Sequence, residues 1–201
     1  MAADKRLASE PGARLGFEDE AGQGLKPPRG RTRGPRAVTP VVKVTAAGTK
    51  RVSLAGLLAF KPGAEHAPRF IHRAIVCHGC KNERKGFDEQ DDIRLLDAAH
   101  QQLRGPIVLV WDNINTHGSE KMRRLIAKRD WLTVFHLPPY APELNPVEGA
   151  WSAMKSGLVN LTRRSIEALT RLVKTRLRRL QYRPATLASL LAKTGPNLQP
   201  P

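Results

Sequence analysis

The sequence predicts a mixed α/β domain in which an antiparallel meander and a parallel βαβ unit share one sheet flanked by helices. Three observations predict this fold class. Short strand-like segments separated by turn residues fill the first part of the chain. A strand, a helix and a second strand then follow within a span typical of a βαβ unit. The last third carries apolar residues at helical spacing.

The first part of the chain is predicted to form the meander. Residues 1–13 are small, polar and unpatterned, and we expect them to be disordered. Residues 22–40 are rich in Gly, Pro and Arg, which predicts an irregular basic arm rather than core. Strands are expected at residues 14–19, 41–45, 50–60 and 69–77.

The second part is predicted to complete the sheet and cover it. The run Pro106–Trp111 is continuously apolar, which suits a strand buried on both faces. Asn145 and Pro146 are a favoured N-cap and a favoured first helical residue. We place the domain at residues 14–182 and a tail with a short helix at residues 183–201. The other expected elements are helices at residues 88–103, 119–128, 165–180 and 185–192 and a strand at residues 131–137.

The charge points to a polyanionic partner. The 201 residues include 34 Lys and Arg against 18 Asp and Glu, a net charge of +16. Such a protein is drawn to nucleic acid, although a ribosomal-type protein or an arginine-rich proteome gives the same composition. No apolar run approaches a membrane span, and the N-terminus lacks the apolar stretch of a signal peptide. We therefore expect a cytoplasmic protein with no membrane partner.

Three acidic residues stand where chemistry is plausible, and each has an ordinary alternative. Asp112 directly follows the buried strand, where open α/β sheets place ligands, but it also suits a turn. Glu148 stands three residues after Asn145, where a capping box alone explains it. Asp19 lies between two glutamates in a strand, so Glu18 and Glu20 share one face and Asp19 has the other. Without further context, the ordinary interpretation of Asp19 is a residue in a solvent-exposed acidic turn.

Three stretches taken together resemble a known family. They are Phe17–Gly22 (FEDEAG), Val110–His117 (VWDNINTH) and Leu137–Lys155 (LPPYAPELNPVEGAWSAMK). They are similar to the motifs of the DDE transposase and integrase superfamily, in particular its mariner-like branch in bacterial insertion sequences. The second and third motifs are long and specific, whereas the first is short. The resemblance covers roughly residues 15–180, and it implies an RNase H-like fold.

The resemblance implies that Asp19, Asp112 and Glu148 are the catalytic residues and the metal ligands. Converging carboxylates suit hard, oxygen-preferring Mg²⁺ or Mn²⁺. Two such ions clamp the attacking and leaving oxygens of a phosphoryl displacement. The implied function is metal-dependent DNA strand cleavage and strand transfer. Supporting roles fall to Asn113, His117 and Asn145, although a structural histidine and a simple helix cap explain the last two equally well.

The implied partner is double-stranded DNA, both transposon ends and target, bound by a homodimer in the bacterial nucleoid. Arg29, Arg31, Arg33 and Arg36 of the arm, and Lys155 two helical turns beyond Glu148, are candidates to contact phosphates. The ordinary alternative for these cations is a solvated surface. Cys77 and Cys80 form one C-x-x-C pair, which supplies too few ligands for zinc, so we interpret them as reduced thiols.

One departure from the family pattern bears on activity. Related transposases carry an N-terminal helix-turn-helix region, and here the first acidic motif begins near residue 17. We expect a truncated copy or one product of a split reading frame. The alternative functions are a catalytically inactive DNA-binding remnant and an RNase H-like nuclease that cuts RNA–DNA hybrids.

Overall fold

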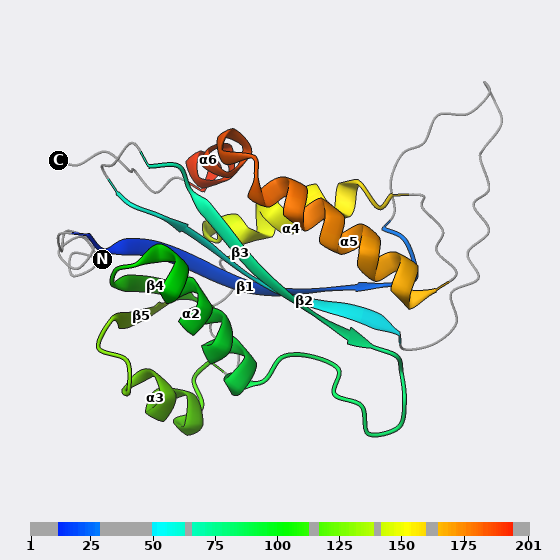
Figure 1. The fold of residues 1–201 in the computed structure, drawn as a ribbon, viewed down its shortest axis with the longest axis horizontal. Coiled ribbons are helices and arrows are strands. Elements are labelled where there is room, and N and C mark those ends of the chain that lie inside the picture. Colours follow the sequence, from blue (N-terminus) through cyan, green and yellow to red (C-terminus); the bar gives the residue numbers. More distant parts are fainter. Residues whose placement is uncertain are drawn as a thin grey trace.

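The computed structural model describes residues 12–28, 50–62, 66–112, 117–138, 142–159 and 165–194. Within these residues, five strands form one sheet in the order β3-β2-β1-β4-β5 (Figure 1). β1 pairs antiparallel with β2 and β2 with β3, whereas β4 runs parallel to both β1 and β5. The predicted combination of meander and parallel unit is therefore confirmed. The strands are β1 (Arg14–Gly24), β2 (Arg51–Phe60), β3 (Arg69–Cys77), β4 (Ile107–Trp111) and β5 (Leu132–His136).

β1 is longer than its apolar pattern predicts. It continues to Gly24 because β2 pairs with it along its whole length, down to the pair Gly24 and Arg51. The prediction that an irregular arm begins at residue 22 is therefore wrong by a few residues. Most of that arm, the expected strand at residues 41–45 and the first eleven residues lie outside the described part of the chain.

Helices cover the sheet in two layers (Figure 1). β2 shows why both faces are covered, since every residue from Val52 to Phe60 is buried. Alternate residues of β2 enter two different apolar cores. Helices α4, α5 and α6 pack on one face, and α2 and α3 on the other. The helices are α2 (Glu89–Leu103), α3 (Glu120–Ile126), α4 (Pro146–Ser156), α5 (Ile166–Gln181) and α6 (Pro184–Lys193), with the short 3-10 helix η1 (Pro142–Leu144) before α4.

Side-chain caps fix where the helices begin. Asp88 starts α2 with a complete capping box to Asp91, and the Ser119 and Ser165 hydroxyls accept from backbone N–H groups of α3 and α5. The expected C-terminal helix is present as α6, and Leu187 and Leu191 are buried in the core that it shares with α4 and α5. α6 is thus packed on the rest of the described structure through these two leucines. Among the described residues, no helix has the length and apolarity that a membrane span requires.

Candidate active site

The strand register sets Asp19 and Asp112 side by side. β1 and β4 are parallel neighbours, with Phe17 opposite Val110. Asp19 and Asp112 each stand two residues beyond this pair, Asp112 just past the end of β4, and the charge of Asp112 acts on Asp19. Asp19 is buried, with 7% of its surface exposed, and the side chain of Asp112 is 31% exposed. One acidic group thus lies within the sheet and the other at the open end of β4.

Helix α4 brings Glu148 to this place. Asn145 caps the helix, because its Oδ1 accepts a hydrogen bond from the Val147 N–H at 3.1 Å. Its Nδ2 also donates to the backbone oxygen of Glu18 at 2.9 Å. The same buried side chain therefore begins α4 and ties it to β1, one residue away from Asp19. Glu148, in the first turn of α4, is exposed to solvent.

Trp151 links α4 to Asp19 directly. Its Nε1–H donates to Asp19 Oδ2 at 3.0 Å, and the residue is 1% exposed. The indole ring lies against Gly56 of β2, where an added Cβ would approach Trp151 to 2.8 Å. In the sequence, Trp151 fits the apolar stripe of this helix, which predicts a core position, and its burial agrees with that prediction. Its position three residues beyond Glu148, on the same side of the helix, is the signal that indicates its link to the site.

The electrostatics show that Glu148 and Asp112 both act on Asp19. Burial, followed by the charges of Glu148 and Asp112, raises the pKa of Asp19 from 3.8 to about 7. The Trp151 hydrogen bond opposes this shift. A bound cation stabilises the charged form of an acidic group that is buried and faces two other carboxylates.

His117 holds Asp112 from the other side. Its Nδ1 lies 2.7 Å from Asp112 Oδ1 and 3.4 Å from the Asp112 backbone oxygen. Both neighbours are acceptors, so Nδ1 carries the hydrogen and donates it. The imidazole is stacked on Trp111 with ring centroids 3.8 Å apart. His117 is therefore a fixed, buried support for Asp112.

The opposite face of β1 carries a second acidic cluster that the sequence analysis missed. Glu18 and Glu20 point toward α2, as the strand alternation predicts, and there they meet Asp92. Burial and the charge of Asp92 raise the pKa of Glu18 well above its usual value. Burial and the charge of Glu20 raise the pKa of Asp92 to about 7. The alternation of β1 indicated this face, but nothing in the sequence indicated Asp92.

The remaining predicted residues divide into two groups. Lys155 is half-buried and lines a shallow hollow together with Glu148 and Pro28, the last described residue in this part of the basic arm. This part of the arm therefore lies beside Glu148. Asn113 and the four arm arginines, Arg29, Arg31, Arg33 and Arg36, lie outside the described residues.

Cys77 and Cys80 are free thiols, the first buried and the second exposed.

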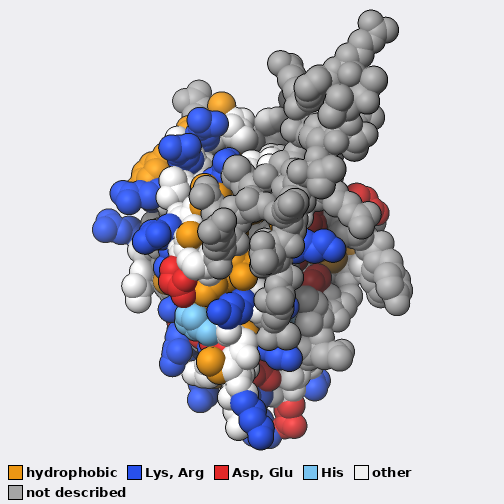
Figure 2. Space-filling model, turned by 90° about the vertical axis from the view of Figure 1, so that its right-hand side faces the viewer, with side chains coloured by type: hydrophobic (Ala, Val, Ile, Leu, Met, Phe, Trp, Pro, Cys, Tyr) orange, Lys and Arg blue, Asp and Glu red, His pale blue; other side chains and the backbone are white. Residues whose placement is uncertain are grey.

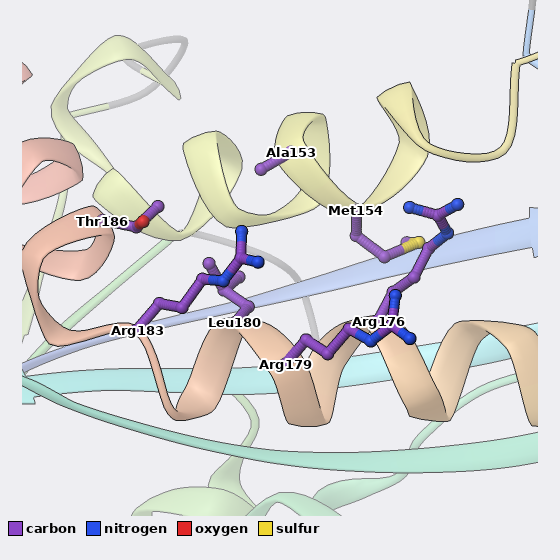
Figure 3. A pocket seen from close by; sticks show the side chains of 7 residues that line it. All are labelled: Ala153, Met154, Arg176, Arg179, Leu180, Arg183 and Thr186. Carbon is purple, nitrogen blue, oxygen red and sulfur yellow. The ribbon is translucent and has the colours of Figure 1, made fainter.

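Arginines gather along α5. Arg176, Arg179 and Arg183 line a pocket between α4, α5 and α6 (Figure 3). A second hollow, between β3 and α5, is lined by Arg73, Lys174 and Arg178. A space-filling view shows Lys and Arg side chains spread over the described surface of one face (Figure 2). The excess positive charge of the chain is thus displayed on the surface, α5 included.

Comparisons with known proteins give one family match and several matches of fold. Residues 14–173 match the family model described as DDE superfamily endonuclease. A search of curated protein sequences finds no match.

Solved structures of Mos1 transposase share the fold. A Mos1 paired-end complex with the left transposon end has a TM-score of 0.58 at 14% identity, covering 98% of this chain and 60% of that one. The mariner Mos1 paired-end complex with Mg has a TM-score of 0.60 at 15% identity, covering 96% and 58%. The Mos1 catalytic domain with Raltegravir and Mn has a TM-score of 0.52 at 14% identity, covering 96% and 88%. The chain thus spans about 60% of the Mos1 chains in the first of these complexes, and the predicted RNase H-like fold is confirmed.

Proposed function

Since this chain belongs to the DDE superfamily endonucleases, we propose that it is the catalytic domain of a transposase that cleaves and joins DNA strands. Asp19, Asp112 and Glu148 are its catalytic residues in this proposal. The observation that carries it is the proximity of these carboxylates, since the charges of Glu148 and Asp112 add to the effect of burial in raising the pKa of Asp19 to about 7. They come from β1, the end of β4 and the start of α4, so the cluster exists only in the folded chain.

The donor set fits a hard divalent cation. Asp19, Asp112 and Glu148 offer carboxylate oxygens, which Mg²⁺ and Mn²⁺ prefer. The raised pKa of Asp19 supports this fit, because burial and the repulsion from Glu148 and Asp112 both disfavour its charged form, which a bound cation would stabilise. When held by these carboxylates, two such ions would supply activation of the attacking oxygen and stabilisation of the leaving oxygen of a phosphodiester. The chain itself holds the ligands in place through Trp151 on Asp19 and His117 on Asp112.

Double-stranded DNA is the proposed substrate, as in the complexes with transposon ends that Mos1 forms. Lys155 lies beside Glu148 and the start of the basic arm, which supports a phosphate path past the carboxylates. Arg176, Arg179 and Arg183 extend the positive surface along α5. Binding through phosphates is independent of sequence and weakens as salt rises.

The test is nicking of supercoiled plasmid DNA by the purified full chain with Mn²⁺ or Mg²⁺. We expect metal-dependent nicking that Glu148→Gln abolishes. Glu143→Gln is the matched control, because this exposed carboxylate lies in η1 just before α4 and is not among the groups that raise the pKa of Asp19. An RNA–DNA hybrid incubated with the chain under the same conditions should stay intact.

Three outcomes contradict the proposal. DNA binding without nicking makes the chain a DNA-binding remnant. Cutting of the hybrid alone makes it an RNase H-like nuclease. Equal nicking by the native chain and Glu148→Gln removes Glu148 from the site. The proposed homodimer on paired DNA ends is tested separately, by sedimentation of the chain with and without DNA.

A further inference from the structure

A second group of potential metal ligands lies on the other face of β1 from Asp19. It consists of Glu20 from β1, Asp92 from α2 and His117 from the segment before α3, and one ligand atom of each lies within 4.8 Å of the other two. Asp92 and His117 are fully buried, with side chains 1% and 0% exposed. The elements that meet here are far apart in the chain, so the fold assembles this group.

Polar atoms in this cluster are buried without hydrogen-bond partners. Both carboxylate oxygens of Asp92 and Nε2 of His117 accept or donate no hydrogen bond within the described structure. Oε1 of Glu18, also buried on this face, has none either. Buried polar atoms are normally paired, because an unpaired one keeps the cost of losing its water. Several such atoms together mark a place where a ligand restores the lost interactions.

The orientation of His117 decides what kind of ligand fits. Its Nδ1–H donates to Asp112, so in the neutral form of the ring Nε2 carries the lone pair. That nitrogen lies 3.9 Å from Asp92 Oδ2, too far for a hydrogen bond. Stacking on Trp111 keeps the ring from turning away. A nitrogen lone pair and two carboxylates that face one another repel unless a cation lies between them.

We propose that Glu20, Asp92 and His117 bind one divalent transition-metal ion, with Zn²⁺ as its best representative. One imidazole nitrogen and two carboxylates are a zinc-type ligand set, whereas Mg²⁺ favours oxygen alone. A metal-bound histidine usually donates its other N–H to a carboxylate, as His117 does to Asp112. This site is distinct from the proposed catalytic cluster and joined to it through one side chain.

The spacing of the ligands suits such an ion after a small inward movement. Zn²⁺ holds its ligands tetrahedrally at about 2.0–2.2 Å, so ligand atoms that share it lie roughly 3.3–3.6 Å apart. Here His117 Nε2 and Asp92 Oδ2 are 3.9 Å apart, and all three ligand atoms lie within 4.8 Å of one another. Glu20 is half-buried and has a long side chain, so it can close the difference without moving the strand. The bound ion ties β1 to α2 and holds His117 against Asp112.

The experiment separates this ion from the catalytic ions. The parent is the full chain carrying Asp19→Asn and Glu148→Gln, which removes two catalytic carboxylates and keeps Asp112 on His117. After chelator treatment, Zn²⁺ is titrated by calorimetry. We expect one bound ion that Mg²⁺ in large excess does not displace. Adding Asp92→Asn or Glu20→Gln weakens binding by at least about 100-fold, whereas Glu120→Gln, an exposed carboxylate at the start of α3, leaves it unchanged.

A second measurement keeps the test independent of folding defects. Nitrogen NMR of His117 in the parent with saturating Zn²⁺ should show hydrogen on Nδ1 and metal on Nε2. A parent that binds no Zn²⁺, or binds it equally well with Asp92→Asn, overturns the proposal. A His117 ring that carries hydrogen on both nitrogens also overturns the proposal, because a proton on Nε2 then takes the place of the metal ion between His117 and Asp92. None of these results bears on DNA nicking, so failure here and failure of the proposed function are distinguishable.

Discussion

The two faces of β1 carry acidic clusters of opposite character. On one face, Asp19 accepts a hydrogen bond from Trp151 and faces two carboxylates that are partly or fully exposed to solvent. On the other, Asp92 is buried with no hydrogen bond to either oxygen. The first cluster is open, as a site for a large substrate requires, and the second is closed. One strand thus builds a proposed reaction site and a proposed structural metal site from adjacent residues.

Asp112 and His117 join the two faces, so removing Asp112 should affect both. For Asp112→Ala we expect DNA nicking to fall by about 1000-fold, because a ligand of the reacting metal is lost. Zn²⁺ affinity at the second cluster should fall by about 10- to 100-fold, because His117 loses its carboxylate acceptor. Glu148→Gln should abolish nicking alone. Unchanged Zn²⁺ affinity in Asp112→Ala would show that the faces are independent.

Stability without metal should fall as pH rises, because the folded chain raises the pKa of Asp19. This pKa is 3.8 for the unfolded group and about 7 in the fold. The contribution is therefore fully present below pH 4 and lost as pH rises through 7, up to roughly 4 kcal/mol. Asp92 acts in the same direction. Denaturant unfolding in chelator should show Asp19→Asn matching the native chain near pH 4 and exceeding it at pH 8. A constant difference between the two chains across that range would contradict the assigned pKa.

Gly56 should be intolerant of a side chain. A Cβ here would lie 2.8 Å from Trp151 and 3.0 Å from Phe70, both held in the core. We expect Gly56→Ala to cost about 1–3 kcal/mol in unfolding free energy and to lower nicking, since displaced Trp151 no longer holds Asp19. Gly86→Ala is the control, because no atom lies within 4 Å of its added Cβ. Equal stability of the two variants would argue against the close packing of Trp151.

The smallest expected effect is that of the Trp151 donor. Trp151→Phe keeps an aromatic ring and removes the hydrogen bond to Asp19, which should cost about 1–2 kcal/mol at neutral pH. It should also raise the pKa of Asp19, since this bond lowers it. Trp131→Phe, at a ring stacked on His100, controls for the loss of an indole. A lowered Asp19 pKa in Trp151→Phe would contradict the assigned role.

The sequence indicated those parts of the site that depend on local rules. Strand alternation separated Asp19 from Glu18 and Glu20, the apolar run ended at Asp112, and the Asn-Pro pair marked the start of α4. All three follow from the period of one element or the chemistry of one cap. The structure agrees at each point.

The rest depends on contacts that no single segment encodes. Asp92 looked like an ordinary acidic residue in the first turn of a helix, where the helix dipole favours it. Only the packing of α2 against β1 reveals that it is buried opposite Glu20. Trp151 fitted an apolar stripe, and that pattern carries no information about the partner of its N–H. Likewise, β1 extends beyond its apolar pattern because β2 pairs with it.

The most direct test of the central claim is a carbon NMR titration of the Asp19 carboxyl in metal-free buffer. The account predicts a pKa of about 7 in the native chain. It predicts a lower pKa in Glu148→Gln, an unchanged one in Glu143→Gln, and ionisation at lower pH when Mg²⁺ is added. An Asp19 pKa near its usual value, or one that Glu148→Gln leaves unchanged, would show that the carboxylates do not converge and would contradict the account.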